Sequence, residues 1–300
     1  MPFYILSLIA FLSCRSPESH EPEGKDIHVF PEYARKNDLP PLEIDTHPGP
    51  HGLPKKLESD RNAVDPVFEK DSQNGTETGK DTVSRAYLTG KFDPSKDSRF
   101  ILVDRKWGNK TMYLRRETYA AFIKMAEAAA ADGINLKIIS ATRNFDQQKN
   151  IWESKWTGRT PVDGRSLPKT IPDPKKRAEK ILEVSSMPGT SRHHWGTDVD
   201  LNNLSDAYFT KKNSSGAKIY AWLAEHAHEF GFCQPYSAGR PHGYHEEKWH
   251  WSYTPLSREF LKAARKQLSD DQISGFLGSE TAVEIQAVKY YVLGINPDCL

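Results

Sequence analysis

Three residues with metal-binding donor atoms lie in the second half of the chain: His193, Asp200 and His250. A catalytic zinc ion takes three nitrogen or oxygen ligands from the protein and keeps a further position open for water. Glu247 precedes the last of these residues by three positions, close enough to accept a proton from such a water. The sequence therefore predicts a zinc site that activates water, with Glu247 as its base.

Spacing alone leaves several assignments open. Three of the four predicted residues have a neighbour of the same type: His194 beside His193, Asp198 two before Asp200, and Glu246 beside Glu247. Both aspartates would point to the same face of a strand, because strand side chains alternate with a period of two. A histidine is also more often a structural or surface residue than a ligand, and this chain has 11.

The order of the motifs resolves these alternatives through a family resemblance. The chain resembles the D-alanyl-D-alanine carboxypeptidases of the vancomycin-resistance type, in the group that joins lysostaphin, D-Ala-D-Ala metallopeptidases and the sonic hedgehog signalling domain. The family shows Ser-x-His, two residues, Gly, three residues, Asp, and later Glu-x-Trp-His. Upstream it has Ser-x-x-Arg, with Gln five residues after the Arg. The matching residues here are Ser140, Arg143, Gln148, Ser191, His193, Gly196, Asp200, Glu247, Trp249 and His250.

This resemblance covers about residues 87–257 and implies a function for the site. It implies that His193, Asp200 and His250 bind Zn²⁺, and that Glu247 is the catalytic base. The reaction would be hydrolysis of the terminal bond in a peptidoglycan stem peptide ending in D-Ala-D-Ala. Arg143 would bind the terminal carboxylate through two parallel hydrogen bonds.

Two other residues are assigned to substrate binding by the same resemblance. Gln148 would either hold Arg143 or contact the peptide, and Ser191 would hydrogen-bond the substrate backbone. The sequence departs from the family at Asp198, where Ala is common, and at Ala141 and Thr142. Asp198 would either orient a histidine ligand or lie on the surface.

Other functions compete with the carboxypeptidase. One is a D,D- or L,D-endopeptidase that cuts wall cross-links. Another is a zinc-stabilised module that binds the cell wall without catalysis, although Glu247 and Arg143 argue against it. A serine hydrolase is disfavoured, because no Gly-x-Ser-x-Gly nucleophile turn is present.

The elements that would position these residues are helices mixed with a few short strands. Apolar spacing predicts helices at 116–132, 146–155, 175–184, 217–230, 255–267 and 281–293, and strands at 134–139, 199–201 and 248–253. Helices and strands do not alternate regularly as in a doubly wound sheet. The prediction is an α+β domain with a small, mostly antiparallel sheet flanked by helices, as in the hedgehog and D-Ala-D-Ala peptidase group.

Composition divides the chain into parts. The peptidase domain is expected at 82–270, with a helical C-terminal extension at 271–300 packed on it. Residues 15–81 are rich in proline and poor in periodic apolar residues, which predicts a disordered tether. A net charge of +1 gives no support to a nucleic-acid partner. We expect a monomer.

The first 14 residues predict export. Phe3 to Leu12 is an apolar run too short to span a bilayer, and it ends at Ser13 and Cys14. This pattern is typical of a signal peptide with a lipoprotein box, which would make Cys14 the lipidated residue. A plain cleaved signal or an uncleaved anchor is the alternative. We expect a location in the periplasm or cell envelope, with membrane contact only through that lipid.

Cys233 and Cys299 remain. In an exported protein the two would either form a disulfide that ties the C-terminus to the domain or stay as free thiols.

Overall fold

The computed structural model describes residues 83–300. The predicted signal peptide, Cys14 and the predicted tether at 15–81 lie outside the described residues. Within 83–300, no helix has the length and apolar character that a bilayer crossing requires.

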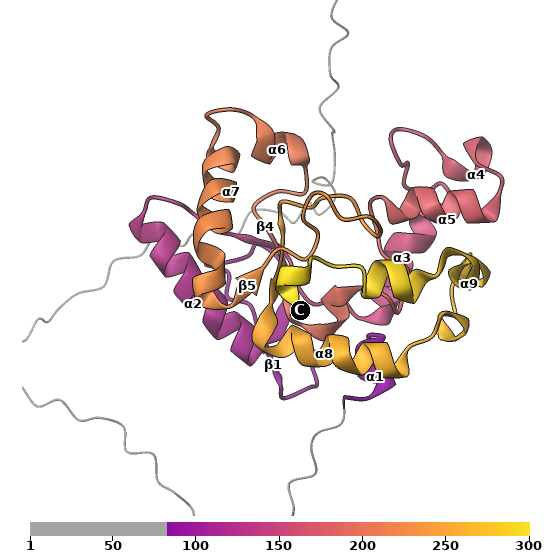
Figure 1. Cartoon of the computed structure of the whole chain (residues 1–300), viewed down its shortest axis with the longest axis horizontal. Coiled ribbons are helices and arrows are strands. Elements are labelled where there is room, and N and C mark those ends of the chain that lie inside the picture. The colour runs from indigo at the N-terminus through magenta and orange to yellow at the C-terminus, as the bar shows by residue number, and fades with distance from the viewer. Residues whose placement is uncertain (1–82) are drawn as a thin grey trace, which may run out of the picture. The chain divides into compact units, whose positions relative to one another are not determined.

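The two sheets of the described part are small and antiparallel. The larger has the order β3-β4-β6-β5, built from β3 (Ile138–Ser140), β4 (Asp198–Leu201), β6 (His250–Tyr253) and β5 (Phe232–Cys233). A separate hairpin pairs β1 (Phe100–Leu102) with β2 (Tyr113–Arg115). Short antiparallel strands among many helices confirm the predicted α+β class (Figure 1).

Strand register divides apolar from polar side chains in the larger sheet. Asp200 of β4 lies opposite His250 of β6, and Val199 lies opposite Trp251. Because side chains alternate along a strand, Val199 and Trp251 point to one face, and Asp200 and His250 to the other. Val199 and Trp251 belong to a buried apolar core. The opposite face carries the polar residues of the candidate site.

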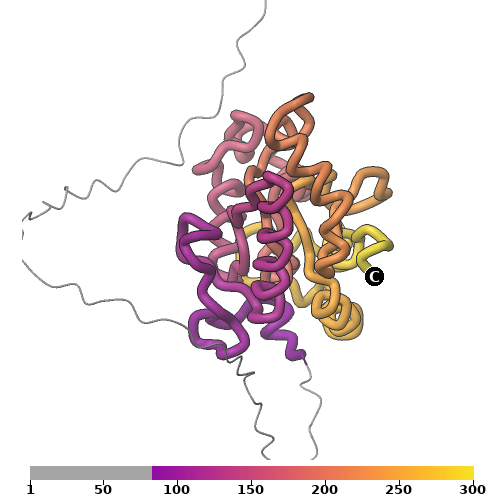
Figure 2. The backbone as a smooth tube through the Cα atoms, turned by 90° about the vertical axis from the view of Figure 1, so that its left-hand side faces the viewer, coloured from indigo at the N-terminus to yellow at the C-terminus, as the bar shows by residue number. Residues whose placement is uncertain are grey.

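The helices α2 (Arg116–Ala131) and α7 (Ser215–His226) cover the apolar face. They lie side by side in both views (Figures 1 and 2), and both contribute buried side chains to the core that contains Val199. Phe122 of α2 and Leu223 of α7 are completely buried there. These two helices therefore hold the sheet in place from its apolar face.

A second apolar core lies among α3 (Phe145–Trp156), α5 (Pro174–Leu182), α8 (Thr254–Gln267) and α9 (Ala282–Ile285). Helix α3 begins at a capping box, in which the Asn144 side chain and the Gln147 side chain each bond the other residue's backbone N–H. Trp152 of α3 is completely buried, and its indole N–H donates to the carbonyl of Leu277 at 2.8 Å. The C-terminal segment therefore packs directly on α3.

The remaining helices are short. They are α1 (Arg85–Leu88), α4 (Leu167–Thr170), α6 (Asp206–Thr210), the 3₁₀ helices η1 (Arg192–Trp195), η2 (Ala227–Phe230), η3 (Asp270–Gln272), η4 (Ser279–Thr281) and η6 (Pro297–Cys299), and a π-helical turn η5 (Val288–Val292).

Three predicted elements differ from the structure by more than two residues at one end or by a break. The strand expected at 134–139 is β3, which begins only at Ile138, because the Ile134 N–H bonds back to Ala129 and closes the end of α2. The helix expected at 217–230 ends at His226 and continues as η2. The helix expected at 281–293 breaks at Gln286, whose φ of 55° is left-handed.

Cys233 and Cys299 form a disulfide. It joins β5, at the edge of the larger sheet, to the last turn of the chain, 66 residues later. The C-terminal segment is also buried through apolar residues, including Ile273, Phe276 and Val292.

Candidate metal centre

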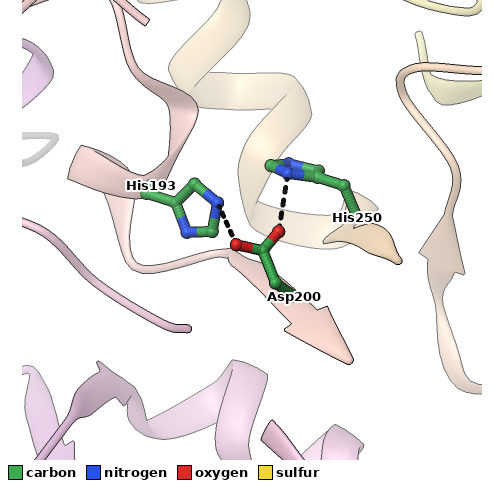
Figure 3. A group of neighbouring side chains, drawn as sticks. All are labelled: His193, Asp200 and His250. Carbon is green, nitrogen blue, oxygen red and sulfur yellow. Dashed lines mark ion pairs between the residues drawn. The ribbon is translucent and has the colours of Figure 1, made fainter. Parts of the chain in front are cut away.

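His193, Asp200 and His250 meet on the polar face of the sheet (Figure 3). One donor atom from each lies within 4.8 Å of the other two. Nε2 of His193 is 3.3 Å from Oδ2 of Asp200, and Nδ1 of His250 is 3.1 Å from Oδ1 of the same carboxylate. All three side chains are buried. The arrangement is a compact N,O,N donor set.

Local backbone geometry brings the three residues together. His193 lies in the 3₁₀ turn η1, and Gly196 ends that turn with φ of +74°. A Cβ at position 196 would also lie 2.4 Å from the ring of Phe100, so glycine is required for conformation and for space. The chain then enters β4, where pairing with β6 places Asp200 directly beside His250.

Hydrogen bonds fix the orientation of both imidazoles. Nδ1 of His193 is 2.8 Å from the carbonyl of Ala141, and Nε2 of His250 is 2.8 Å from Oδ2 of Asp198. Both partners are acceptors, so those ring nitrogens carry the hydrogens. In the neutral rings, Nε2 of His193 and Nδ1 of His250 then direct lone pairs toward Asp200.

This arrangement fits a bound cation. Asp200 Oδ1 is buried and has no hydrogen-bond donor among the described residues. Two ring lone pairs and a carboxylate facing one another repel unless a positive charge lies between them. Two histidines and one carboxylate, with a cavity on one side, are the ligand set of a mononuclear hydrolytic zinc centre. The residues present therefore fit the zinc ion that the sequence predicts.

The protonation equilibria of the two histidines differ. Burial and the nearby Arg143 lower the pKa of His193, despite the opposing effect of Asp200. Burial also disfavours charge on His250, but the nearby carboxylates of Asp198, Asp200 and Glu247 outweigh burial and hold its pKa well above the usual value. The three carboxylates that favour a proton on His250 would equally favour a divalent cation beside it.

Asp198 lies behind His250 in a fully buried network. Its Oδ2 accepts from Nε of Arg192 at 3.0 Å as well as from His250, and its Oδ1 accepts from Thr197 and Ser252. Burial opposes ionisation, but the Arg192 charge and the His250 bond keep the pKa of Asp198 low. Of the two roles considered for this residue, the structure places it as the hydrogen-bond partner of His250 and not on the surface.

Glu247 and Glu246 occupy different positions. Oε2 of Glu247 is 3.4 Å from Nδ1 of His250, on the nitrogen that faces Asp200. Glu246 instead forms an ion pair with Lys248 and accepts from the hydroxyl of Tyr220 at 3.3 Å. Glu247 is therefore the glutamate that lies beside the donor set.

His194 points away from the donor set. Its Nδ1 bonds the carbonyl of Arg143 at 2.6 Å, and its Nε2 accepts from the N–H of Gly189 at 3.0 Å. Burial lowers its pKa to about 3, so it stays neutral. Both ring nitrogens therefore bond backbone groups of neighbouring loops, and one of these bonds holds the backbone of Arg143.

A cavity of about 400 Å³ opens in front of the donor set. Arg143 lines it, with Nε donating to Oε1 of Gln148 at 2.9 Å and Nη1 donating to Ser140 at 2.5 Å. Nη1 also lies 3.6 Å from Oδ2 of Asp200. Gln148 in turn donates to the carbonyl of Ser186 at 2.8 Å, so it holds Arg143 in place.

Ser191 and the two tryptophans near His250 lie in different environments. Ser191 is buried, does not line the cavity, and has a hydroxyl without a hydrogen-bond partner among the described residues. Its contact with substrate stays a prediction. Trp251 packs in the core behind the sheet, whereas Trp249 precedes the strand and lines the cavity.

Several lining residues were not found by the motifs. Lys155, Ser185, Asp206, Tyr236 and Tyr244 all border the cavity. The ring of Tyr236 lies against His250, with 4.6 Å between centroids. One signal in the sequence was available: Gln148, Ile151 and Lys155 recur at helical spacing, which places them on one face of α3. The other residues come from loops without periodicity.

A buried two-histidine, one-carboxylate donor set beside a glutamate, on a small antiparallel sheet, defines the class of mononuclear metallohydrolases. Comparison with known proteins identifies the family. Residues 111–256 match the family model "VanY: D-alanyl-D-alanine carboxypeptidase". Residues 111–256 are thus a VanY-family domain, and homologues in that family are metallopeptidase hydrolases.

Individual relatives are more distant. A D-alanyl-D-alanine carboxypeptidase of Enterococcus faecalis is 31% identical over 132 residues, which cover 43% of this chain and 44% of the relative. The putative carboxypeptidase YodJ of Bacillus subtilis is 25% identical over 199 residues, covering 64% and 63%. The chain thus spans less than two thirds of either relative.

Solved structures show weaker likeness. The structure of VanYB in complex with D-alanine-D-alanine is 22% identical, with a TM-score of 0.40, and covers 57% of this chain and 84% of that chain. A structure of the vancomycin resistance D,D-pentapeptidase VanY in complex with Zn(II) is 20% identical, with a TM-score of 0.38, and covers 60% and 88%.

Proposed function

We propose that this protein is a zinc-dependent D-alanyl-D-alanine carboxypeptidase that acts on peptidoglycan stem peptides. The observation that carries the proposal is the buried donor set of His193, Asp200 and His250, with Glu247 on one side and Arg143 on the other. Membership of the VanY family supports the substrate class, and the relative from Enterococcus faecalis carries the same activity in its name.

His193 Nε2, the Asp200 carboxylate and His250 Nδ1 would hold the zinc ion. When bound, zinc supplies acidification of a water molecule and polarisation of the scissile carbonyl. The hydrogen bonds from the outer nitrogens of both rings keep the inner nitrogens available as ligands.

Glu247 moves the proton. Its carboxylate lies next to the donor set and lines the cavity, so it can accept a proton from the attacking water. It then delivers that proton to the amine of the leaving D-alanine. The products are a shortened peptide and free D-alanine, and water supplies the added oxygen and hydrogens.

Arg143 sets the register of the peptide. Its Nε and Nη1 are held by Gln148 and Ser140, and the part of its guanidinium not used in those bonds can receive the terminal carboxylate. Binding the carboxylate there places the last peptide bond near the donor set. An internal residue without a free carboxylate would lack this contact.

The test uses the purified full chain and a stem pentapeptide that ends in D-Ala-D-Ala. We expect release of one D-alanine per peptide, loss of activity with a zinc chelator, and recovery on adding Zn²⁺, all followed by mass spectrometry. Cleavage restricted to cross-linked muropeptides would replace the carboxypeptidase by an endopeptidase. Zinc binding without hydrolysis of either substrate would make the protein a binding module.

We also propose export and anchoring through lipidated Cys14 to the cell envelope, with a monomeric domain that reaches its substrate. The Cys14→Ser variant tests this. Metabolic labelling with a fatty acid should mark the wild-type protein and not the variant, and fractionation should move the variant out of the membrane fraction.

A further inference from the structure

Lys155 is a second cation in the cavity. It lies on the same face of α3 as Gln148 and Ile151, and all three line the cavity. The side chain is half-buried, and its ammonium donates to the hydroxyl of Ser185. No family motif includes this residue.

The other charges around the cavity have partners of opposite sign. Glu183 pairs with Lys180 at 2.5 Å, and Glu246 and Asp206 both pair with Lys248. Asp200 and Glu247 face His250, and Arg143 lies near Asp200. Among residues 83–300, no carboxylate lies within ion-pair distance of Lys155.

The surroundings of Lys155 are electrostatically unfavourable for an ammonium. Burial, and secondarily the charge of Arg143, lower its pKa to about 8. Two cations line a partly enclosed cavity, and among the described residues Lys155 donates only to the hydroxyl of Ser185. An anion that enters the cavity would stabilise the charged forms of both side chains.

The position of Lys155 along α3 indicates where that anion would lie. Arg143 precedes α3 and lies beside Asp200, so the N-terminal end of α3 is near the donor set. Lys155 is seven residues after Gln148, about 10 Å further along the helix axis. The flexible lysine stem can direct its ammonium back along the cavity. The subsite therefore lies beyond Arg143, on the side of the leaving residue.

We propose that Lys155 forms a second carboxylate subsite next to Arg143, which adapts the cavity to a leaving residue with two carboxylates. This inference rests on the proposed peptidase function. Arg143 would bind the α-carboxylate of the last residue, and Lys155 its side-chain carboxylate. Water adds across the last peptide bond, and a dicarboxylic D-amino acid leaves as the free amine.

The kinetic test compares three peptides that differ only in the last residue: D-Ala, D-Glu or D-Gln. D-Glu and D-Gln have the same shape and differ by one charge. For the zinc-loaded full chain we expect kcat/KM for D-Glu to exceed that for D-Gln by about fivefold or more. Equal values for the two peptides would overturn the subsite.

Variants assign the preference to one residue. Lys155→Gln should abolish the ratio of D-Glu to D-Gln, and Lys155→Arg should retain it. Lys149→Gln is the matched control, because Lys149 lies on the same helix but does not line the cavity. A ratio that survives in Lys155→Gln, or that falls equally in Lys149→Gln, would contradict the assignment. Thermal melting confirms folding, and Lys155→Arg decides if Lys155→Gln does not fold.

A binding measurement separates this inference from the proposed function. Calorimetry on the zinc-loaded Glu247→Gln variant with the dipeptides D-Ala-D-Glu and D-Ala-D-Gln does not depend on turnover. Tighter binding of D-Ala-D-Glu supports the subsite, and equal binding overturns it. Failure of the wild-type chain to release the last residue from any of the three peptides would overturn the peptidase, while the binding ratio alone would then decide the subsite.

Discussion

The two walls of the cavity are built differently. One wall consists of η1, β4 and β6, where sheet register and buried hydrogen bonds fix His193, Asp200 and His250. The other consists of α3 and the segment 183–186, which are joined by side-chain bonds from Gln148 and Lys155. In the proposed function the first wall would supply the chemistry, and its residues form close sequence motifs. The second wall would select the substrate, and its residues are brought together by packing.

Removing the base should have the largest effect on turnover. Glu247→Gln keeps the size of the side chain but cannot accept the proton, so kcat should fall by about 10²- to 10⁴-fold while zinc content stays normal. Turnover and metal analysis on the same preparation check this. Glu246→Gln is the matched control and should keep most of the activity, because Glu246 is paired with Lys248. Equal losses in the two variants would remove the distinction between the glutamates.

A change at Arg143, which Gln148 of the second wall holds, should act on substrate recognition. Arg143→Lys keeps the charge but loses the planar fork, so kcat/KM should fall by about 10- to 100-fold for a peptide with a free terminal carboxylate. The same peptide with an amidated C-terminus is the comparison. The preference for the free acid should shrink in the variant. If the preference is unchanged, Arg143 does not bind the carboxylate.

A substitution of Asp198 tests whether its hydrogen bond to His250 supports the first wall. Asp198→Asn should weaken zinc binding by about 10- to 100-fold, because His250 and Arg192 lose their charged partner. Competition with a chromophoric chelator measures the affinity directly. Asp206→Asn, at the edge of the cavity, should leave the zinc affinity close to that of the wild type. Unchanged affinity in Asp198→Asn would show that ring orientation is fixed by other contacts.

The smallest expected effect is a change of substrate preference with pH, caused by Lys155 on the second wall. Lys155 has a pKa of about 8, so it is charged below pH 8 and neutral above it. The other charged groups on this side of the cavity are Arg143 and Glu183, and Glu183 is paired with Lys180. The ratio of kcat/KM for D-Glu over D-Gln should therefore be full at pH 7 and fall by about threefold by pH 9. A flat ratio across this range would contradict titration of Lys155.

The difference between the walls also explains what the sequence could predict. Helix α2 follows directly from its apolar spacing, and the 116–132 range differs from the structure by one residue. The short strands carrying Asp200 and His250 were found because alternation and motif coincide there. The hairpin of β1 and β2 has three-residue strands, which are too short for a periodic signal.

Other features depend on distant contacts that no local pattern encodes. The break at Gln286 lies in a segment with helical spacing, and it is set by packing of α9 and η5 on the second core. Helical spacing predicts that Lys155 lies on the same face of α3 as Gln148. Its contact with Ser185 depends on how residues 183–186 pack against that helix. The choice between a disulfide and free thiols likewise required the fold.

The disulfide between Cys233 and Cys299 connects the strand next to β6 with the C-terminal segment that packs on α3. Cys233 belongs to β5, which pairs with the strand of His250, while the segment that ends at Cys299 packs on α3 through Leu277 and Gly275. The covalent ring that this bond closes spans residues 233–299 and contains Glu247 and His250, and by loop length it stabilises the fold by about 4 kcal/mol. Reducing agents would leave each wall intact but loosen their mutual spacing. We therefore expect reduction to weaken substrate binding before it slows hydrolysis at the donor set.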